Sequence, residues 1–175
     1  IRVDANGAFP VESALDRLKE LSELELHSIE QPIGAGQMDQ MAELCARTPL
    51  PIALDEELIG YIEMESKSAL LEAIRPQYII LKPSLAGGFS GSEEWIRLAE
   101  LYESGWWVTS ALESNIGLNA IAQWTSTLDV HMPQGLGTGS LFTNNFDSPL
   151  EVQKGSLHYR IGKSWDIQKI FKICT

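Results

Sequence analysis

Short apolar runs recur along this chain of 175 residues, and a charged residue ends each of the first four. Runs of this length between turn residues predict strands that are buried on both faces of a sheet. The four runs are Ile1–Asp4, His27–Glu30, Ile52–Asp55 and Tyr78–Lys82. Their last residues are 26, 25 and 27 positions apart, so each interval has room for one turn and one helix.

Apolar residues at helical spacing fill the intervals between these runs. The pattern predicts helices over 11–21, 38–45 and 63–74. A fourth helix is expected to follow a capping box formed by Ser90 and Glu93.

The later part of the chain continues the alternation and then becomes irregular. Trp106–Thr109 predicts a fifth strand, and a helix is expected over 116–127. Residues 132–136 leave room for a sixth strand in a Gly-rich region. Two short strand-like runs follow at 150–152 and 157–161.

Repeated strand–helix units predict an α/β fold with parallel strands joined by right-handed crossovers. An open doubly wound sheet and a (β/α) barrel both use this repeat. Charged residues at the ends of four successive strands favour the barrel, in which all strand ends face one mouth. Eight units of about 26 residues need roughly 210 residues, more than this chain has, and it opens directly on a strand. We therefore expect a partial TIM-type barrel that lacks its first strands.

Composition excludes several classes of function. The formal net charge of −11 argues against binding to a nucleic-acid backbone. No stretch approaches the roughly 20 apolar residues that span a membrane. Cys45 and Cys174 form neither a metal motif nor a disulfide framework, which favours a cytoplasmic location.

The strand-end charges predict a metal site. A single acid after a strand is most often a helix cap or a solvated loop residue. Asp4, Glu30 and Asp55 in three successive units favour a shared site instead, and oxygen-only ligands suit Mg²⁺. Lys82 follows on the next strand. Beside a dication its pKa is expected to be lowered toward the range useful for acid–base work.

Four short motifs resemble those of the enolase superfamily, in the subgroup that contains muconate cycloisomerases. They are Asp4-Ala5-Asn6, Glu30-Gln31-Pro32, Leu54-Asp55-Glu56 and Leu81-Lys82-Pro83. The resemblance implies that the three acids bind Mg²⁺ from the third, fourth and fifth barrel strands and that catalytic Lys82 ends the sixth. It also implies that residues 1–140 are a barrel from its third strand onward and that 141–175 pack on the barrel or on a capping domain. The family's N-terminal capping domain and its second-strand Lys-x-Lys motif have no counterpart in this sequence.

Residues 110–117 and 135–139 are similar to the o-succinylbenzoate synthase branch of that superfamily. This resemblance implies a Mg²⁺-dependent lyase, a dehydratase of menaquinone biosynthesis that acts on a small carboxylate. By resemblance the substrate would contact Arg2, Ser110, Glu113, Ser114 and Asn115.

Two alternatives stay open at this point. The first is an N-acylamino acid racemase or dipeptide epimerase of the same superfamily, in which Lys82 would be an acid–base group. The second is a catalytically dead binding or structural module. The chain by itself is expected to show little or no turnover and to associate with itself, because an open barrel exposes strand edges and apolar surface.

Overall fold

A computed structural model of the chain describes residues 1–172, which form two compact units. The first unit comprises residues 1–107, and the second begins at Val108. The boundary expected between residues 140 and 141 is a different division of the chain and stays a prediction. Cys174 lies outside the described residues.

A five-stranded sheet forms the centre of the first unit, with its strands in the order of the sequence. The strands are β1 (Arg2–Asp4), β2 (Ser28–Glu30), β3 (Ile52–Leu54), β4 (Tyr78–Leu81) and β5 (Gly105–Val108). The pairs β1–β2, β2–β3 and β3–β4 are parallel, as the strand–helix repeat predicted. The five predicted strands are therefore all present.

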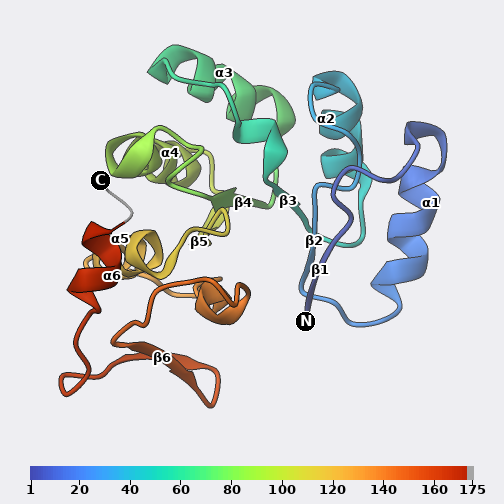
Figure 1. Cartoon of the computed structure of the whole chain (residues 1–175). Helices are drawn as coiled ribbons and strands as arrows, with labels where there is room; N and C mark the ends of the chain where they lie inside the picture. Colours follow the sequence, from blue (N-terminus) through green and yellow to red (C-terminus); the bar gives the residue numbers. More distant parts are fainter. Residues whose placement is uncertain (173–175) are drawn as a thin grey trace. The chain divides into compact units, whose positions relative to one another are not determined.

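Helices connect the strands and lie along one side of the sheet (Figure 1). They are α1 (Val11–Ser22), α2 (Met38–Arg47), α3 (Met64–Ile74) and α4 (Gly88–Leu101), with a short 3₁₀ helix η1 (Glu56–Leu58) after β3. Consecutive helices pack against each other. The core contains Leu18, Met41, Leu71 and Trp95 from the four helices, all fully buried.

The start of α4 differs from the sequence-based expectation. The helix begins at Gly88, and its N-cap is Gly87 in a left-handed conformation without a side-chain cap. Ser90 and Glu93 therefore lie inside the helix, and the predicted capping box is wrong. Glycine adopts positive φ without a steric cost, so the chain can turn into the helix three residues earlier.

The second unit contains a helix, a hairpin and short irregular segments. Its elements are α5 (Asn115–Thr125), η2 (Thr138–Ser140), β6 (Leu150–Gln153), β7 (Ser156–Tyr159) and α6 (Ile167–Phe171). The two late strand-like runs are confirmed as an antiparallel hairpin. The expected sixth strand is reduced to one parallel bridge between Thr109 and Gly135.

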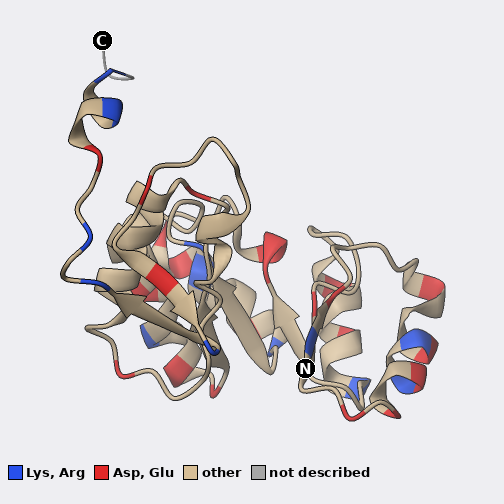
Figure 2. Cartoon of the chain, turned by 60° about the horizontal axis from the view of Figure 1, so that its bottom comes forward, with Lys and Arg blue, Asp and Glu red and all other residues tan. Residues whose placement is uncertain are grey.

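Charged residues of both signs are distributed over the two units. Lys and Arg are interspersed with Asp and Glu along the ribbon (Figure 2). No helix among residues 1–172 has the length and apolar character required to cross a membrane.

Candidate functional site

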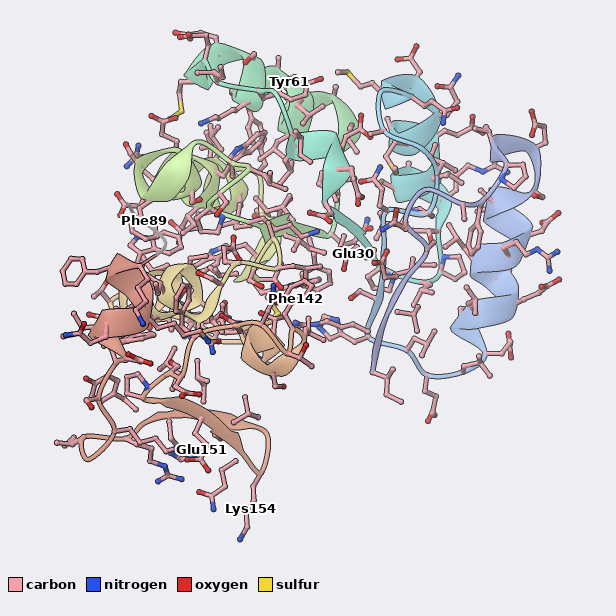
Figure 3. All side chains as sticks on the ribbon, in the orientation of Figure 1. Glu30, Tyr61, Phe89, Phe142, Glu151 and Lys154 are labelled. Atoms are coloured by element: carbon pink, nitrogen blue, oxygen red, sulfur yellow. The ribbon has the colours of Figure 1, made fainter. Side chains whose placement is uncertain are left out.

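Strand register places the four predicted site residues on one face of the sheet. Asp4 lies opposite Glu30, and Glu30 lies opposite Ala53. Since side chains alternate along a strand, Asp55 shares the face of Ala53. Ala53 in turn lies opposite Tyr78, which has the same parity as Lys82. The four charged side chains therefore gather where β1 to β4 end, and Figure 3 labels Glu30 at the end of β2.

Backbone hydrogen bonds continue beyond β1 and β2 and hold their loops together. Ala5 N donates to Glu30 O at 3.0 Å, and Phe9 N donates to Pro32 O at 3.0 Å. Gly7 has φ +70°, and a Cβ there would lie 3.0 Å from Cα of Gly34. This close approach requires glycine at position 7.

Lys82 joins two of the predicted metal ligands. Its ammonium forms a salt bridge with Asp55 and lies 3.9 Å from Glu30 Oε1. Asp55 is buried, whereas Glu30 and Lys82 are about one-fifth exposed. Asp4 is exposed, and its Oδ1 accepts a hydrogen bond from Asn6 N at 2.7 Å. The structure thus brings Glu30, Asp55 and Lys82 into contact and leaves Asp4 at the rim.

The acids in this cluster perturb one another. Burial, together with a hydrogen bond and charge repulsion from Asp55, raises the pKa of Glu30 to about 8. Burial is also the main cause that raises the pKa of Glu56, which neighbours Asp55. Such shifts arise where like charges share a poorly solvated site.

The lowered pKa of Lys82 is expected beside a bound dication and stays a prediction, since the protein's own groups act on this lysine in both directions. Burial acts in the expected direction, but the hydrogen bond and charge of Asp55, with Glu30 and Glu56, raise the pKa above its ordinary value. Neighbouring carboxylates favour the charged ammonium. Lys82 is therefore a positively charged group at this site.

These residues suit Mg²⁺ by the type of their ligand atoms, whereas their side chains are not arranged as a metal site in this structure. Within residues 1–172, no three His, Cys, Asp or Glu side chains form a group that could hold a metal ion as they stand. The three predicted ligands, Asp4, Glu30 and Asp55, nevertheless all offer carboxylate oxygens, which are the ligands that a hard dication prefers. Glu56 adds a buried Oε2 for which the described residues supply no hydrogen-bond partner. The metal ligands stay a prediction.

Arg2 lies two positions before Asp4 on the same strand face. Its guanidinium stacks on Trp107, 3.9 Å from the ring centroid, and Tyr78 packs against the same ring. Burial lowers the pKa of Arg2. The side chain is thereby held flat on an aromatic surface, and its predicted contact with substrate stays a prediction.

The other predicted substrate contacts belong to the second unit. Ser110 is buried and its hydroxyl lies 2.6 Å from Thr138 Oγ1. Ser114 is the N-cap position of α5. Asn115 donates from its backbone to Asn145 and from its side chain to Phe146 O.

Glycines 135 and 139 allow the second unit to pack closely on itself. A Cβ at Gly135 would lie 2.5 Å from Thr109 Oγ1, and one at Gly139 would lie 2.4 Å from Asn115 Oδ1. Glu113, the remaining predicted contact, is half-buried beside Gly117. The roles of Ser110, Glu113 and Asn115 toward substrate stay predictions.

Two polar residues at the site were not assigned a role from the sequence. Gln31 and Glu57 are both buried and hydrogen-bonded to each other at 3.1 Å. Their positions beside Glu30 and Asp55 were the only available signal. Nothing in a single sequence pairs residues 26 positions apart.

Comparison with known proteins gives a family. A family model described as "Enolase C-terminal domain-like" matches residues 1–163. An o-succinylbenzoate synthase from Desulfotalea psychrophila is 62% identical over 157 residues, which cover 90% of this chain and 42% of that protein. The chain thus spans less than half the length of this curated relative.

Solved structures share the fold of this chain. The crystal structure of MenC from Desulfotalea psychrophila, 62% identical, superimposes with a TM-score of 0.87 and is covered to 44%, with 90% of this chain matched. The muconate lactonizing enzyme from Pseudomonas putida, 25% identical, gives a TM-score of 0.84, with 98% of this chain and 49% of that chain covered. The predicted enolase-type barrel architecture and the muconate-cycloisomerase-like neighbourhood are confirmed.

Proposed function

Because the chain belongs to the enolase C-terminal domain-like family, we propose that it carries the metal-binding half of a Mg²⁺-dependent o-succinylbenzoate synthase. The ligands would be Asp4, Glu30 and Asp55, one from each of three neighbouring strands. The observation that supports this most directly is the shared strand face, where these acids and Lys82 meet at one edge of the sheet. Identity of 62% to a synthase supports the choice of reaction.

Each group has a proposed task in the reaction. When bound, Mg²⁺ would offset the negative charge that develops on a substrate carboxylate as a proton leaves the adjacent carbon. Lys82 places its ammonium beside Asp55 and Glu30. A fixed cation in a partly buried site stabilises developing anionic charge more than the same cation in water does. Lys82 therefore acts electrostatically in this proposal.

The proposed substrate is a small-molecule carboxylate. Arg2 presents a guanidinium that stacks on Trp107 and so loses little further freedom on binding an anion. Ser110, Glu113, Ser114 and Asn115 are proposed contacts through their similarity to the synthase branch. A cytoplasmic location is part of the proposal, supported by Cys45, a buried cysteine without a disulfide within the described residues.

A chimera tests the proposed activity. The 175 residues would replace the matched 42% of the Desulfotalea psychrophila synthase. We expect the chimera to dehydrate the cyclohexadiene precursor of o-succinylbenzoate in the presence of Mg²⁺, and to lose this activity with EDTA. The same chimera with Lys82→Ala should be inactive although folded.

Two outcomes would contradict the proposal. A folded chimera without dehydratase activity, assayed beside an active parent enzyme, would favour a catalytically dead module. Racemisation of N-acylamino acids or epimerisation of dipeptides without dehydration would favour the other branch of the superfamily.

The 175 residues by themselves are proposed to be inactive or nearly so and to self-associate. The outer edge of β1 has no neighbouring strand within the described sheet, and Ile1 beside it is 91% exposed. Unpaired strand edges pair with other chains. Measurable dehydratase activity of this polypeptide alone would refute the proposed inactivity. A monomer in sedimentation experiments at high concentration would refute the proposed self-association.

A further inference from the structure

Gln31 directly follows Glu30 and has an unusual conformation. Its φ is +37°, in the left-handed region that residues other than glycine rarely adopt. Its side chain is buried, with 1% exposed. Strained backbone of this kind persists only where surrounding contacts fix it, and it concentrates at functional sites.

The backbone of Gln31 contacts both neighbouring strand ends. Its N–H donates to Ala53 O at 2.9 Å, and its carbonyl accepts from Gly7 N at 2.7 Å. Ala53 lies on β3 two residues before Asp55, and Gly7 lies in the loop that follows Asp4. One residue thus joins the loops or strands of all three predicted metal ligands.

The amide side chain of Gln31 adds a second set of contacts. Its Oε1 accepts from Asp55 N at 3.2 Å and from Glu57 N at 3.3 Å. Its Nε2 donates to Ile33 O at 3.0 Å and to Glu57 Oε2 at 3.1 Å. All four hydrogen-bonding positions of the amide are used, and reversing the amide would place NH₂ against two N–H donors.

Glu57 closes this network from the other side. Its carboxylate is buried, with 3% of the residue exposed, and its Oε1 accepts from Gly36 N at 2.9 Å. The carboxylate therefore spans the loop after β2, while its own backbone is held by Gln31. Fully satisfied buried networks of this kind fix the geometry of the groups attached to them.

We propose that Gln31, braced by Glu57, is a positioning residue that sets the spacing of Asp4, Glu30 and Asp55 for a divalent cation. The proposal rests on the metal site of the proposed function and adds a residue that touches neither cation nor substrate. Its contacts hold the ends of β1 and β3, at which Asp4 and Asp55 lie, against the end of β2, which carries Glu30. Outer partners that orient metal ligands typically change metal affinity 10–100-fold when removed.

Gln77 offers a matched control within the same unit. It directly precedes β4, its Oε1 accepts from Ile52 N at 2.9 Å and its Nε2 donates to Cys45 O at 3.0 Å. These bonds tie the beginning of β3, at the opposite end of the sheet from Asp55. Gln77→Leu should therefore lower stability without altering the ligand spacing.

The test measures Mn²⁺ binding to the full 175-residue chain by electron paramagnetic resonance, without any activity assay. In variants shown to be folded by circular dichroism, we expect Gln31→Leu to raise the Mn²⁺ Kd roughly tenfold or more. Gln31→Asn keeps the amide but shortens the side chain, and it should raise Kd as well. Gln77→Leu should leave Kd within about twofold although its thermal midpoint falls. Should Gln31→Leu fail to fold, Glu57→Gln serves in its place, with an expected increase of roughly threefold or more.

The possible results separate this role from the metal site itself. Unchanged Kd in folded Gln31 or Glu57 variants overturns the positioning role and leaves the metal site intact. An equal increase in Gln77→Leu also overturns it, because the effect would then follow from lost stability. Absence of Mn²⁺ binding by the unmodified chain overturns the metal site, and the positioning role with it.

Discussion

Lys82 and Asp55, which directly follow the adjacent strands β4 and β3, form a salt bridge in which the aspartate is almost completely buried. A cation that binds Asp55 must compete with this ammonium. We therefore predict that Lys82→Met, which keeps an unbranched side chain one atom shorter and removes its charge, raises the Mn²⁺ affinity of the chain by roughly tenfold. Titration of the variant with Mn²⁺, followed by electron paramagnetic resonance, measures this affinity. Lys19→Met, at an exposed position of α1, is the control, and weaker binding by Lys82→Met would contradict the prediction.

Asp55→Asn should have the opposite effect. The substitution keeps the shape of the side chain and removes one anionic ligand, and ligand charge sets the affinity of oxygen sites. We expect Mn²⁺ affinity to fall by at least roughly tenfold. Asp39→Asn, in the first turn of α2, should leave affinity unchanged. Equal affinity of the Asp55 and Asp39 variants would mean that the proposed ligand set is wrong.

The strand-end residues could be predicted from the sequence because strands buried on both faces leave a plain signal. Leu54 and Ile80 lie in short uninterrupted apolar runs, and a charge after such a run marks where the strand ends. The register that gathers these charges follows from parallel pairing of similar units.

The rest depended on contacts that no local pattern contains. Gln31 and Glu57 are neighbours of predicted ligands, but their mutual hydrogen bond joins two loops 26 residues apart. The start of α4 followed from the positive φ of Gly87 instead of from the capping-box pattern at Ser90 and Glu93. A glycine's conformation is decided by tertiary packing, which single-sequence patterns do not specify.

Gly91→Ala should destabilise the first unit although alanine is the better helix former. A Cβ at Gly91, within α4, would lie 2.3 Å from the carbonyl oxygen of Ala86 and 3.5 Å from Lys67 Nζ. The backbone contact cannot be relieved by a rotamer change, so we expect a loss of about 1–3 kcal/mol in the free energy of unfolding. Urea denaturation measures the change. Gly162→Ala, where an added Cβ meets no atom within 4 Å, should stay within about 0.5 kcal/mol, and equal stabilities of the two variants would contradict the packing argument.

Cys45 should be chemically inert while the chain is folded. Burial, with a smaller contribution from the Glu57 carboxylate, raises the pKa of its thiol to about 12. The reactive thiolate is therefore scarce near pH 8. In a Cys174→Ser background, we expect iodoacetamide to modify Cys45 only after unfolding in urea. Rapid labelling of the folded chain would show that α2 opens or that the thiol is accessible.

The same shift predicts a direction for stability at high pH. Above the ordinary thiol pKa near 8.5, the unfolded chain loses the Cys45 proton while the folded chain retains it up to about pH 12. The free energy of unfolding should therefore fall as pH rises through this range, by at most about 1.4 kcal/mol per pH unit from this group. The free energy of unfolding is measured against pH for the chain and for its Cys45→Ala variant, and the difference between the two slopes gives the contribution of the Cys45 thiol. Equal slopes would rule this contribution out.

The hydrogen bonds from Ala5 to Glu30 and from Phe9 to Pro32 join backbone atoms only. Mutation can therefore replace both donor side chains over generations without moving the ends of β1 and β2. Proline is the one amino acid excluded at both donor positions on these grounds, because it lacks the N–H. The relative placement of Asp4 and Glu30 is thus held by main-chain atoms, and these two hydrogen bonds do not depend on the side chains at positions 5 and 9.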